Sequence, residues 1–139
     1  MMNKKKRGQI STEYLIVVGF IVFLVIGILS LAFFYATSAD DVIRINQINN
    51  FANKILSNAE SVFFAGEPSR VSITAYLPKG VNSVSIIDDN LYFNVSTSSG
   101  ISLIAFQSDV PISGSLRNGE GVKAIKIVAS QDAVSISDN

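Results

Sequence analysis

The sequence predicts an α+β protein: a long N-terminal α-helix, apolar in its first half and amphipathic in its second, followed by a small antiparallel β-sheet or β-sandwich. Three observations support this fold class. Residues 14–36 form an apolar run that only two glycines and one serine interrupt. Apolar residues then recur at helical spacing as far as residue 62, and from residue 70 onward apolar and polar residues alternate as they do in strands.

The apolar run is long enough to cross a membrane. No charged residue occurs between Glu13 and Asp40. As a helix, the run would be about 35 Å long, whereas the hydrocarbon core of a bilayer is about 30 Å thick. Four basic residues precede it and would hold that side in the cytoplasm, so the rest of the chain should lie outside. These are Lys4, Lys5, Lys6 and Arg7.

Hydropathy alone leaves more than one interpretation of this run. A permanent single-span anchor fits its length. A cleaved secretory signal has a shorter apolar stretch, of about 7–15 residues, although the small residues Thr37, Ser38 and Ala39 could imitate its cleavage site. A third interpretation depends on the residues between the basic cluster and the run, because an ordinary anchor has no need of a glutamate there.

The stretch KKKRGQISTEYL resembles the class III signal peptide of archaeal type IV pilin-like proteins. That family has the pattern Gln-x-Ser-x-Glu-Tyr-Leu after a basic leader and a glycine. The matching residues here are Gly8, Gln9, Ser11, Glu13, Tyr14 and Leu15. With the apolar run included, the resemblance covers about a quarter of the chain.

The resemblance implies a processing and assembly pathway. Residues 1–8 would be a leader that a prepilin peptidase removes by cutting between Gly8 and Gln9. Residues 9–66 would form a helix that spans the membrane before assembly and lies in the filament core afterwards, and residues 67–139 would form the β domain. The implied partners are the peptidase, a membrane platform, an assembly ATPase and other pilin subunits. The precursor would lie in the cell membrane and the product in an adhesive pilus at the cell surface.

Glu13 would be the fifth residue of the processed chain, where type IV pilins carry a glutamate. In that family it is proposed to pair with the N-terminal amine of a neighbouring subunit and so to set the register of assembly. An interfacial glutamate beside the first helical turn is the alternative. If Gln9 cyclises to pyroglutamate, the amine is lost and Glu13 needs neutral donors instead.

The second half of the helix should pack on the β domain. Its apolar residues are spaced by three and four, which places them on one face. They are Ile45, Ile48, Ala52, Ile55, Ala59 and Val62. Gly66 and Pro68 should end the helix. About 70 residues make a marginal core on their own, so this face should complete it.

Alternation predicts strands at residues 71–77, 84–87, 91–95, 101–106, 122–129 and 134–136. Asp88, Asp89 and Asn90 indicate a tight turn, with calcium ligation as the weaker alternative. Asn118 and Gly119 indicate another turn. Asn94-Val95-Ser96 matches the N-glycosylation pattern, but Asn94 also lies within an expected strand.

The composition argues for a structural protein and against an enzyme. The chain contains no His and no Cys, so a histidine base, a thiolate nucleophile and a Cys/His zinc site are excluded. We therefore expect no catalytic residue, no metal and no cofactor. Basic and acidic residues number eleven each, and the one basic cluster lies in the leader, so we expect no nucleic-acid partner. Two alternatives to a major pilin stay open: an anchored surface protein with a binding β domain, and a minor pilin that primes the filament.

Overall fold

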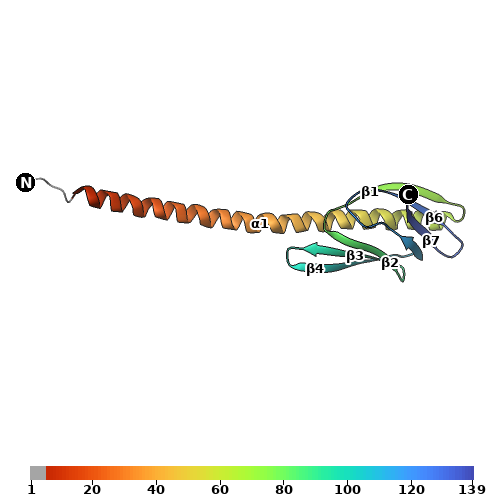
Figure 1. The fold of residues 1–139 in the computed structure, drawn as a ribbon. Coiled ribbons are helices and arrows are strands. Elements are labelled where there is room, and N and C mark those ends of the chain that lie inside the picture. The colour runs from red at the N-terminus through yellow and green to blue at the C-terminus, as the bar shows by residue number, and fades with distance from the viewer. Residues whose placement is uncertain (1–5) are drawn as a thin grey trace, which may run out of the picture. The chain divides into compact units, whose positions relative to one another are not determined.

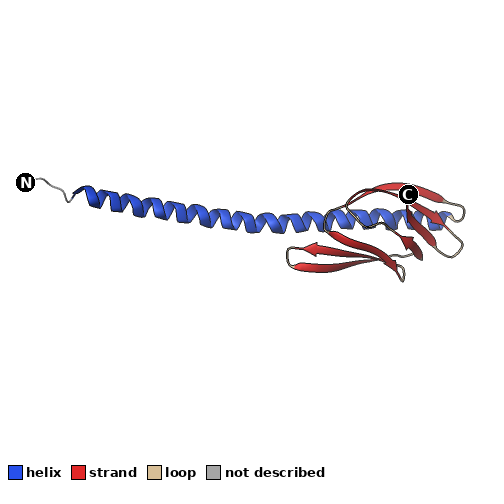
Figure 2. Cartoon of the chain, viewed as in Figure 1, coloured by secondary structure: helices blue, strands red, loops and turns tan. Residues whose placement is uncertain are grey.

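The chain folds into one long helix followed by seven strands, which confirms the expected α+β class (Figures 1 and 2). The computed structural model describes the backbone of residues 6–139 and the side chains of residues 11–139. The elements in that part of the chain are α1 (Lys6–Ala65), β1 (Arg70–Leu77), β2 (Val81–Ile87), β3 (Asn90–Thr97), β4 (Gly100–Gln107), β5 (Ile112–Ser115), β6 (Gly121–Ala129) and β7 (Val134–Asp138).

The strands form two sheets (Figure 1). One has four strands in the order β1-β6-β7-β5, and the other has three in the order β2-β3-β4. The three-stranded sheet is antiparallel throughout, as expected. In the four-stranded sheet β5 instead runs parallel to β7. A parallel pair needs a crossover connection, and here the intervening chain, which includes β6, provides it.

The expected turn at residues 88–90 is confirmed as a two-residue hairpin loop. Asp88 and Asp89 have φ angles of 50° and 61°, and Ile87 pairs directly with Asn90 across the loop. Two consecutive residues with positive φ define the type I′ turn, whose twist matches that of antiparallel strands. Asp and Asn tolerate this conformation better than other residues with a side chain. The turn therefore fixes the register of β2 against β3.

Contacts divide the chain into two compact units, the first ending at Ala39 and the second covering Asp40–Asn139. The second unit contains the amphipathic half of α1 and both sheets, and these share one hydrophobic core. Most of the predicted helical stripe is buried in it, but Ile45 is 37% exposed, so the buried stripe begins at Ile48. Phe51, which lies beside the predicted stripe, is also buried and contacts Phe93 of β3 edge to face.

The expected end of the helix is confirmed. Helix α1 ends at Ala65, and Gly66 follows it with a φ of 77°. The amide of Gly66 donates a hydrogen bond of 3.1 Å to the carbonyl of Phe63. A glycine in this conformation after the last turn is a common helix terminus, because it has no Cβ to clash.

Candidate functional site

The apolar half of α1 is the first candidate site. Every residue from Ser11 to Asp40 is exposed within the structure, and the helix is long and apolar enough to serve as a membrane anchor or a signal sequence. Tyr14 and Leu15, which match the end of the Gln-x-Ser-x-Glu-Tyr-Leu pattern, are 71% and 72% exposed. Since nothing in the described chain covers this surface, lipid or another protein must do so in the cell.

The polar side chains of this segment suit an apolar environment. The hydroxyl of Ser30 donates to the carbonyl of Ile26 at 2.8 Å, and Thr37 donates to Phe34 at 2.9 Å. Such bonds to the preceding turn satisfy a hydroxyl inside the helix itself. These residues therefore do not leave an unsatisfied donor facing the surroundings of the helix.

The residues that resemble a class III signal peptide lie at the very start of the described chain, and their role in processing stays a prediction. Lys4 and Lys5 fall outside the described residues, and Lys6, Arg7, Gly8 and Gln9 belong to α1, with side chains that are likewise outside the description. Ser11 and Glu13 are exposed. Among residues 11–139, no ion pair involves Glu13. The structure places these residues next to one another only because they are consecutive in the sequence.

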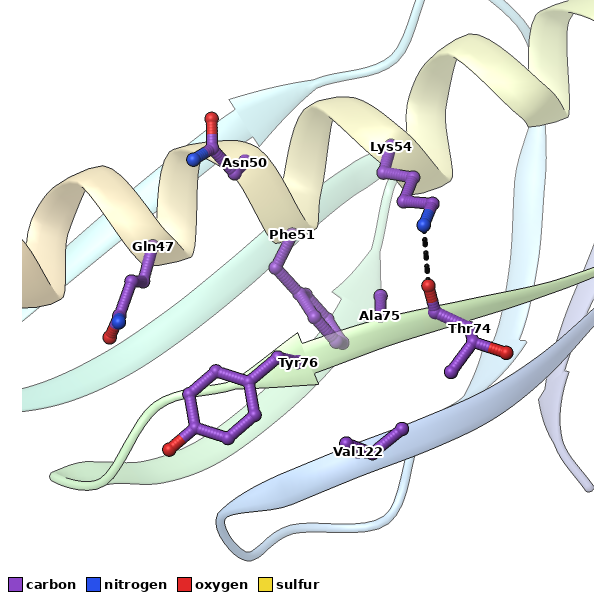
Figure 3. Close-up of a pocket in the computed structure, with 8 residues that line it drawn as sticks. All are labelled: Gln47, Asn50, Phe51, Lys54, Thr74, Ala75, Tyr76 and Val122. Carbon is purple, nitrogen blue, oxygen red and sulfur yellow. Dashed lines mark hydrogen bonds between the residues drawn. The ribbon is translucent and has the colours of Figure 1, made fainter.

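A groove between α1 and the edge of the four-stranded sheet is the second candidate (Figure 3). Its volume is about 420 Å³. The amine of Lys54 donates to the carbonyl of Thr74 across it, as the dashed line shows. A second hollow of about 190 Å³ shares Gln47 and Tyr76 with the first. The lining of the larger groove is Gln47, Asn50, Phe51, Lys54, Thr74, Ala75, Tyr76 and Val122.

The groove has little chemistry to offer. Lys54 and Tyr76 are its ionisable side chains, and no carboxylate lines the larger hollow to act with them. In the part of the chain that the structure describes, no three acidic side chains lie close enough together to hold a metal ion. The contact between Lys54 and Thr74 instead attaches β1 to the helix, because it occupies a carbonyl at the edge of the sheet.

The other residues singled out in the sequence lie at structural positions. Asn94 is half-buried in β3, the central strand of its sheet, and its Oδ1 accepts a hydrogen bond of 3.3 Å from the amide of Asn82. Whether Asn94 carries a glycan stays a prediction. The Asp89 Oδ1 accepts from the backbone N–H of Ile112 at 3.0 Å, and the Asn118 Oδ1 accepts from that of Val84 at 2.9 Å. The first bond joins the β2–β3 turn to β5, and the second joins the segment between β5 and β6 to β2.

Sequence reasoning missed a polar contact between the helix and the β3–β4 hairpin. The Asp41 carboxylate accepts hydrogen bonds from both the hydroxyl and the backbone N–H of Ser98, in the hairpin loop. These bonds, led by that of the hydroxyl, hold the pKa of Asp41 below its ordinary value of 3.8, and the nearby Arg44 guanidinium acts in the same direction. Arg44 also donates to the carbonyl of Ser96 at 2.7 Å.

The signal that could have drawn attention to this hairpin is its lack of charge. No charged residue occurs between Asp89 and Asp109, a stretch that includes all of β3 and β4. Alternation identified both strands, but pairing a loop serine with a helix aspartate 57 residues away requires the structure.

Comparisons with known proteins add no relative. The sequence matches no known protein family, and neither the curated proteins nor the solved structures contain a match to it. The resemblance to pilin-like proteins therefore rests on residues 4–15 and the apolar run that follows them.

Proposed function

We propose that this chain is a structural, non-enzymatic subunit of an archaeal type IV-like adhesion pilus. The observation that carries the proposal is the position of the signature: a basic leader, Gly8 and the QISTEYL motif lie in register directly before an apolar helix. The complete exposure of that helix supports the proposal, because a bundle of such helices from many copies would bury it.

In the proposed pathway, the basic leader, Gly8 and the apolar helix each have a separate role. The basic leader holds the precursor with its N-terminus in the cytoplasm. A prepilin peptidase then cuts after Gly8, where a small residue suits a narrow subsite. A membrane platform and an assembly ATPase draw the processed subunit out of the bilayer, and its helix joins those of earlier subunits. The β domains face the solvent and carry out adhesion.

Glu13 would specify how neighbouring subunits are staggered. A carboxylate in an apolar bundle is costly unless it is paired, so registers that leave it unpaired are disfavoured. Its partner in the proposed filament is the amine of Gln9 in a neighbouring copy, which exists only after cleavage. Cleavage and assembly are thereby coupled by one pair of groups.

The test is intact-mass measurement with N-terminal sequencing of the protein from native membranes and from sheared surface filaments. We expect a start at Gln9, or at its pyroglutamate, in the filament fraction. A start at Met1 or Met2, confined to membranes, would overturn the proposal and leave an anchored surface protein. A start at Asp40 would identify an ordinary secreted protein. The share of this chain in the filaments distinguishes a major pilin from a minor one.

Two variants of Gly8 sharpen the experiment. Gly8→Ala keeps a small side chain before the cut and should be processed like the native chain. Gly8→Phe introduces a bulky one, which a narrow subsite excludes, so the leader should stay attached and the protein should remain in the membrane. Equal processing of both variants would argue against a prepilin peptidase as the protease.

A further inference from the structure

The β3–β4 hairpin presents an unusual surface. All of Asn90–Gln107 is free of charge, in a chain with 16% charged residues. Ile101 and Leu103 of β4 are 76% and 67% exposed. They pair with Ser96 and Asn94 of β3, so they lie on the face of the sheet that points away from the buried Phe93. This face therefore combines hydroxyl and amide groups with exposed apolar side chains.

Strand β4 is also an unprotected sheet edge. It is the last strand in the order β2-β3-β4. In contrast, a carbonyl of the edge strand β1 is occupied by Lys54, and the edge strands β2 and β5 lie against each other. Proteins usually guard an exposed edge with charge or proline, and β4 has neither. This edge and the face beside it are therefore available for contact with another surface in the cell.

The β3–β4 hairpin is attached to α1 at residues that follow the apolar run closely in the sequence. Its loop residue Ser98 is hydrogen-bonded to Asp41, and Ser96 is hydrogen-bonded to Arg44. Asp41 is five positions after Ala36, the last residue of the run. Five residues span at most about 18 Å even when fully extended. This bound follows from the covalent chain alone.

We propose that the β3–β4 hairpin rests on the outer surface of the membrane that the apolar helix spans, with Ile101 and Leu103 in the boundary between lipid headgroups and acyl chains. The headgroup region adds about 5–7 Å on each side of the hydrocarbon core, so a loop fixed to Asp41 is within reach of it.

Lipid fits this surface better than a second copy of the chain. Within the described residues, Lys54 occupies one carbonyl of β1 and the edge strands β2 and β5 lie near each other, so β4 is the least guarded edge that a second copy could pair with. Such pairing would use the backbone of β4 and would leave the face with Ile101 and Leu103 uncovered, whereas lipid would cover that face. An uncharged face with hydroxyl groups suits the headgroup region, where charge is not needed and hydrogen-bond partners are plentiful. The proposal rests on the membrane span alone and does not require filament formation.

The chain contains no cysteine, so single-cysteine labelling is unambiguous. We would reconstitute the full chain into phosphatidylcholine vesicles with an environment-sensitive fluorophore at Ile101→Cys. The matched control is Ile87→Cys, which replaces an exposed isoleucine on the same face of the same sheet. Along β3 their partners Ser96 and Asn90 are six positions apart, which corresponds to about 20 Å.

We expect blue-shifted emission at position 101 that headgroup-proximal spin-labelled lipid quenches strongly, and little quenching at position 87. Equal quenching at the two positions, or none at position 101, would overturn the proposal. Blue-shifted emission at position 101 that spin-labelled lipid fails to quench would also overturn it, because a second copy would then cover β4. None of these outcomes depends on pilus assembly, so failure here is distinguishable from failure of the proposed function.

A charge variant provides an independent check with the label at Ser99→Cys in the hairpin loop. Leu103→Asp places a charge in the proposed lipid contact and should abolish most of the quenching of that label. Ile87→Asp, the matched control outside the contact, should leave it unchanged. Both positions are exposed, so neither substitution disturbs the core. Unchanged quenching in Leu103→Asp would contradict the lipid contact.

Discussion

Gly114 is the described glycine at which an added Cβ would come closest to a backbone atom. Its φ is 129°, and a Cβ built there would overlap the carbonyl oxygen of Ile136 in the neighbouring strand β7. Gly100, at the start of β4, has a nearly identical φ of 127° but no atom within 4 Å of the same built Cβ. The two glycines therefore separate the cost of backbone conformation from the cost of close approach.

Gly114→Ala should lower the free energy of unfolding of the full chain in detergent micelles by about 3 kcal/mol or more, since backbone strain and the clash add together. Gly100→Ala should cost only the conformational penalty, about 1–2 kcal/mol. Urea unfolding followed by circular dichroism in the β region measures both values. Equal losses would mean that β7 moves away from β5 without cost.

The Asp41 contact with Ser98 should depend on pH. Because these hydrogen bonds lower the pKa of Asp41 below 3.8, they favour the folded hairpin loop at pH values above 3.8. The contribution is lost as the pH falls through the still lower pKa of the folded state. In the full chain in micelles, hydrogen exchange at the Ser98 amide should therefore become less protected relative to neighbouring amides on acidification. Asp41→Asn should remove this pH dependence, and a variant that retained it would exclude Asp41 as its origin.

At the scale of elements, the amphipathic half of α1 was predictable from its sequence because one face of the helix packs against the sheets over most of that length. A stripe from Ile48 to Val62 is buried as the spacing indicates. Two residues differ from the predicted stripe because tertiary contacts set their burial. Ile45 is partly exposed because it precedes the part of the helix that the sheets cover, and Phe51 is buried because it packs against Phe93. The periodicity identifies a buried face but not its limits.

Strand β5 was not predictable from the sequence. It has four residues, ISGS, of which only Ile112 is buried, so alternation gives no signal. Its parallel pairing with β7 depends on the close approach at Gly114. The turn at Asp88 and Asp89 was predictable because its backbone conformation demands particular residues. In the candidate site, the QISTEYL motif and the apolar run can be recognised from the sequence alone. The contact between Asp41 and Ser98 cannot, because these residues are far apart in the sequence.

The buried stripe makes a specific prediction about stability. Ile55 is fully buried, whereas Ile43, three turns earlier on α1, is 55% exposed. Ile55→Ala should destabilise the β domain by about 2–5 kcal/mol, because it removes buried methyl groups and leaves a cavity. Ile43→Ala should change stability by less than about 0.5 kcal/mol. Thermal unfolding of the two variants in micelles gives the comparison, and a similar loss in both would contradict a core that begins at Ile48.

At the scale of the whole molecule, the two halves of α1 have different surroundings. Its second half is covered by the sheets of the same chain, and its first half has no cover within the described residues. Loss of the four leader charges would leave seven basic against eleven acidic residues and would remove the groups that hold the N-terminus at the cytoplasmic face. The proposed cleavage would therefore free the N-terminal end of the apolar half from the cytoplasmic face without altering the β domain.

Glu13→Gln tests the assembly role proposed for this carboxylate. Gln preserves the size and hydrogen-bonding capacity of the side chain but removes its charge, so insertion into the membrane and cleavage after Gly8 should proceed as in the native chain. Filament yield should fall severely, because registers that the ionic pair excludes become equivalent to the correct one. The measurement compares sheared filaments with processed protein that remains in the membrane.

The matched control for this experiment is Glu67→Gln, which removes the same charge from an exposed position after the end of α1. It should assemble normally, since it lies in the solvent-facing part of the proposed filament. Native filament yield from Glu13→Gln would show that the charge does not set the register. Loss of cleavage in that variant would instead assign Glu13 to recognition by the peptidase. An accumulation of cleaved, unassembled subunits is therefore the one outcome that supports a role for Glu13 in assembly.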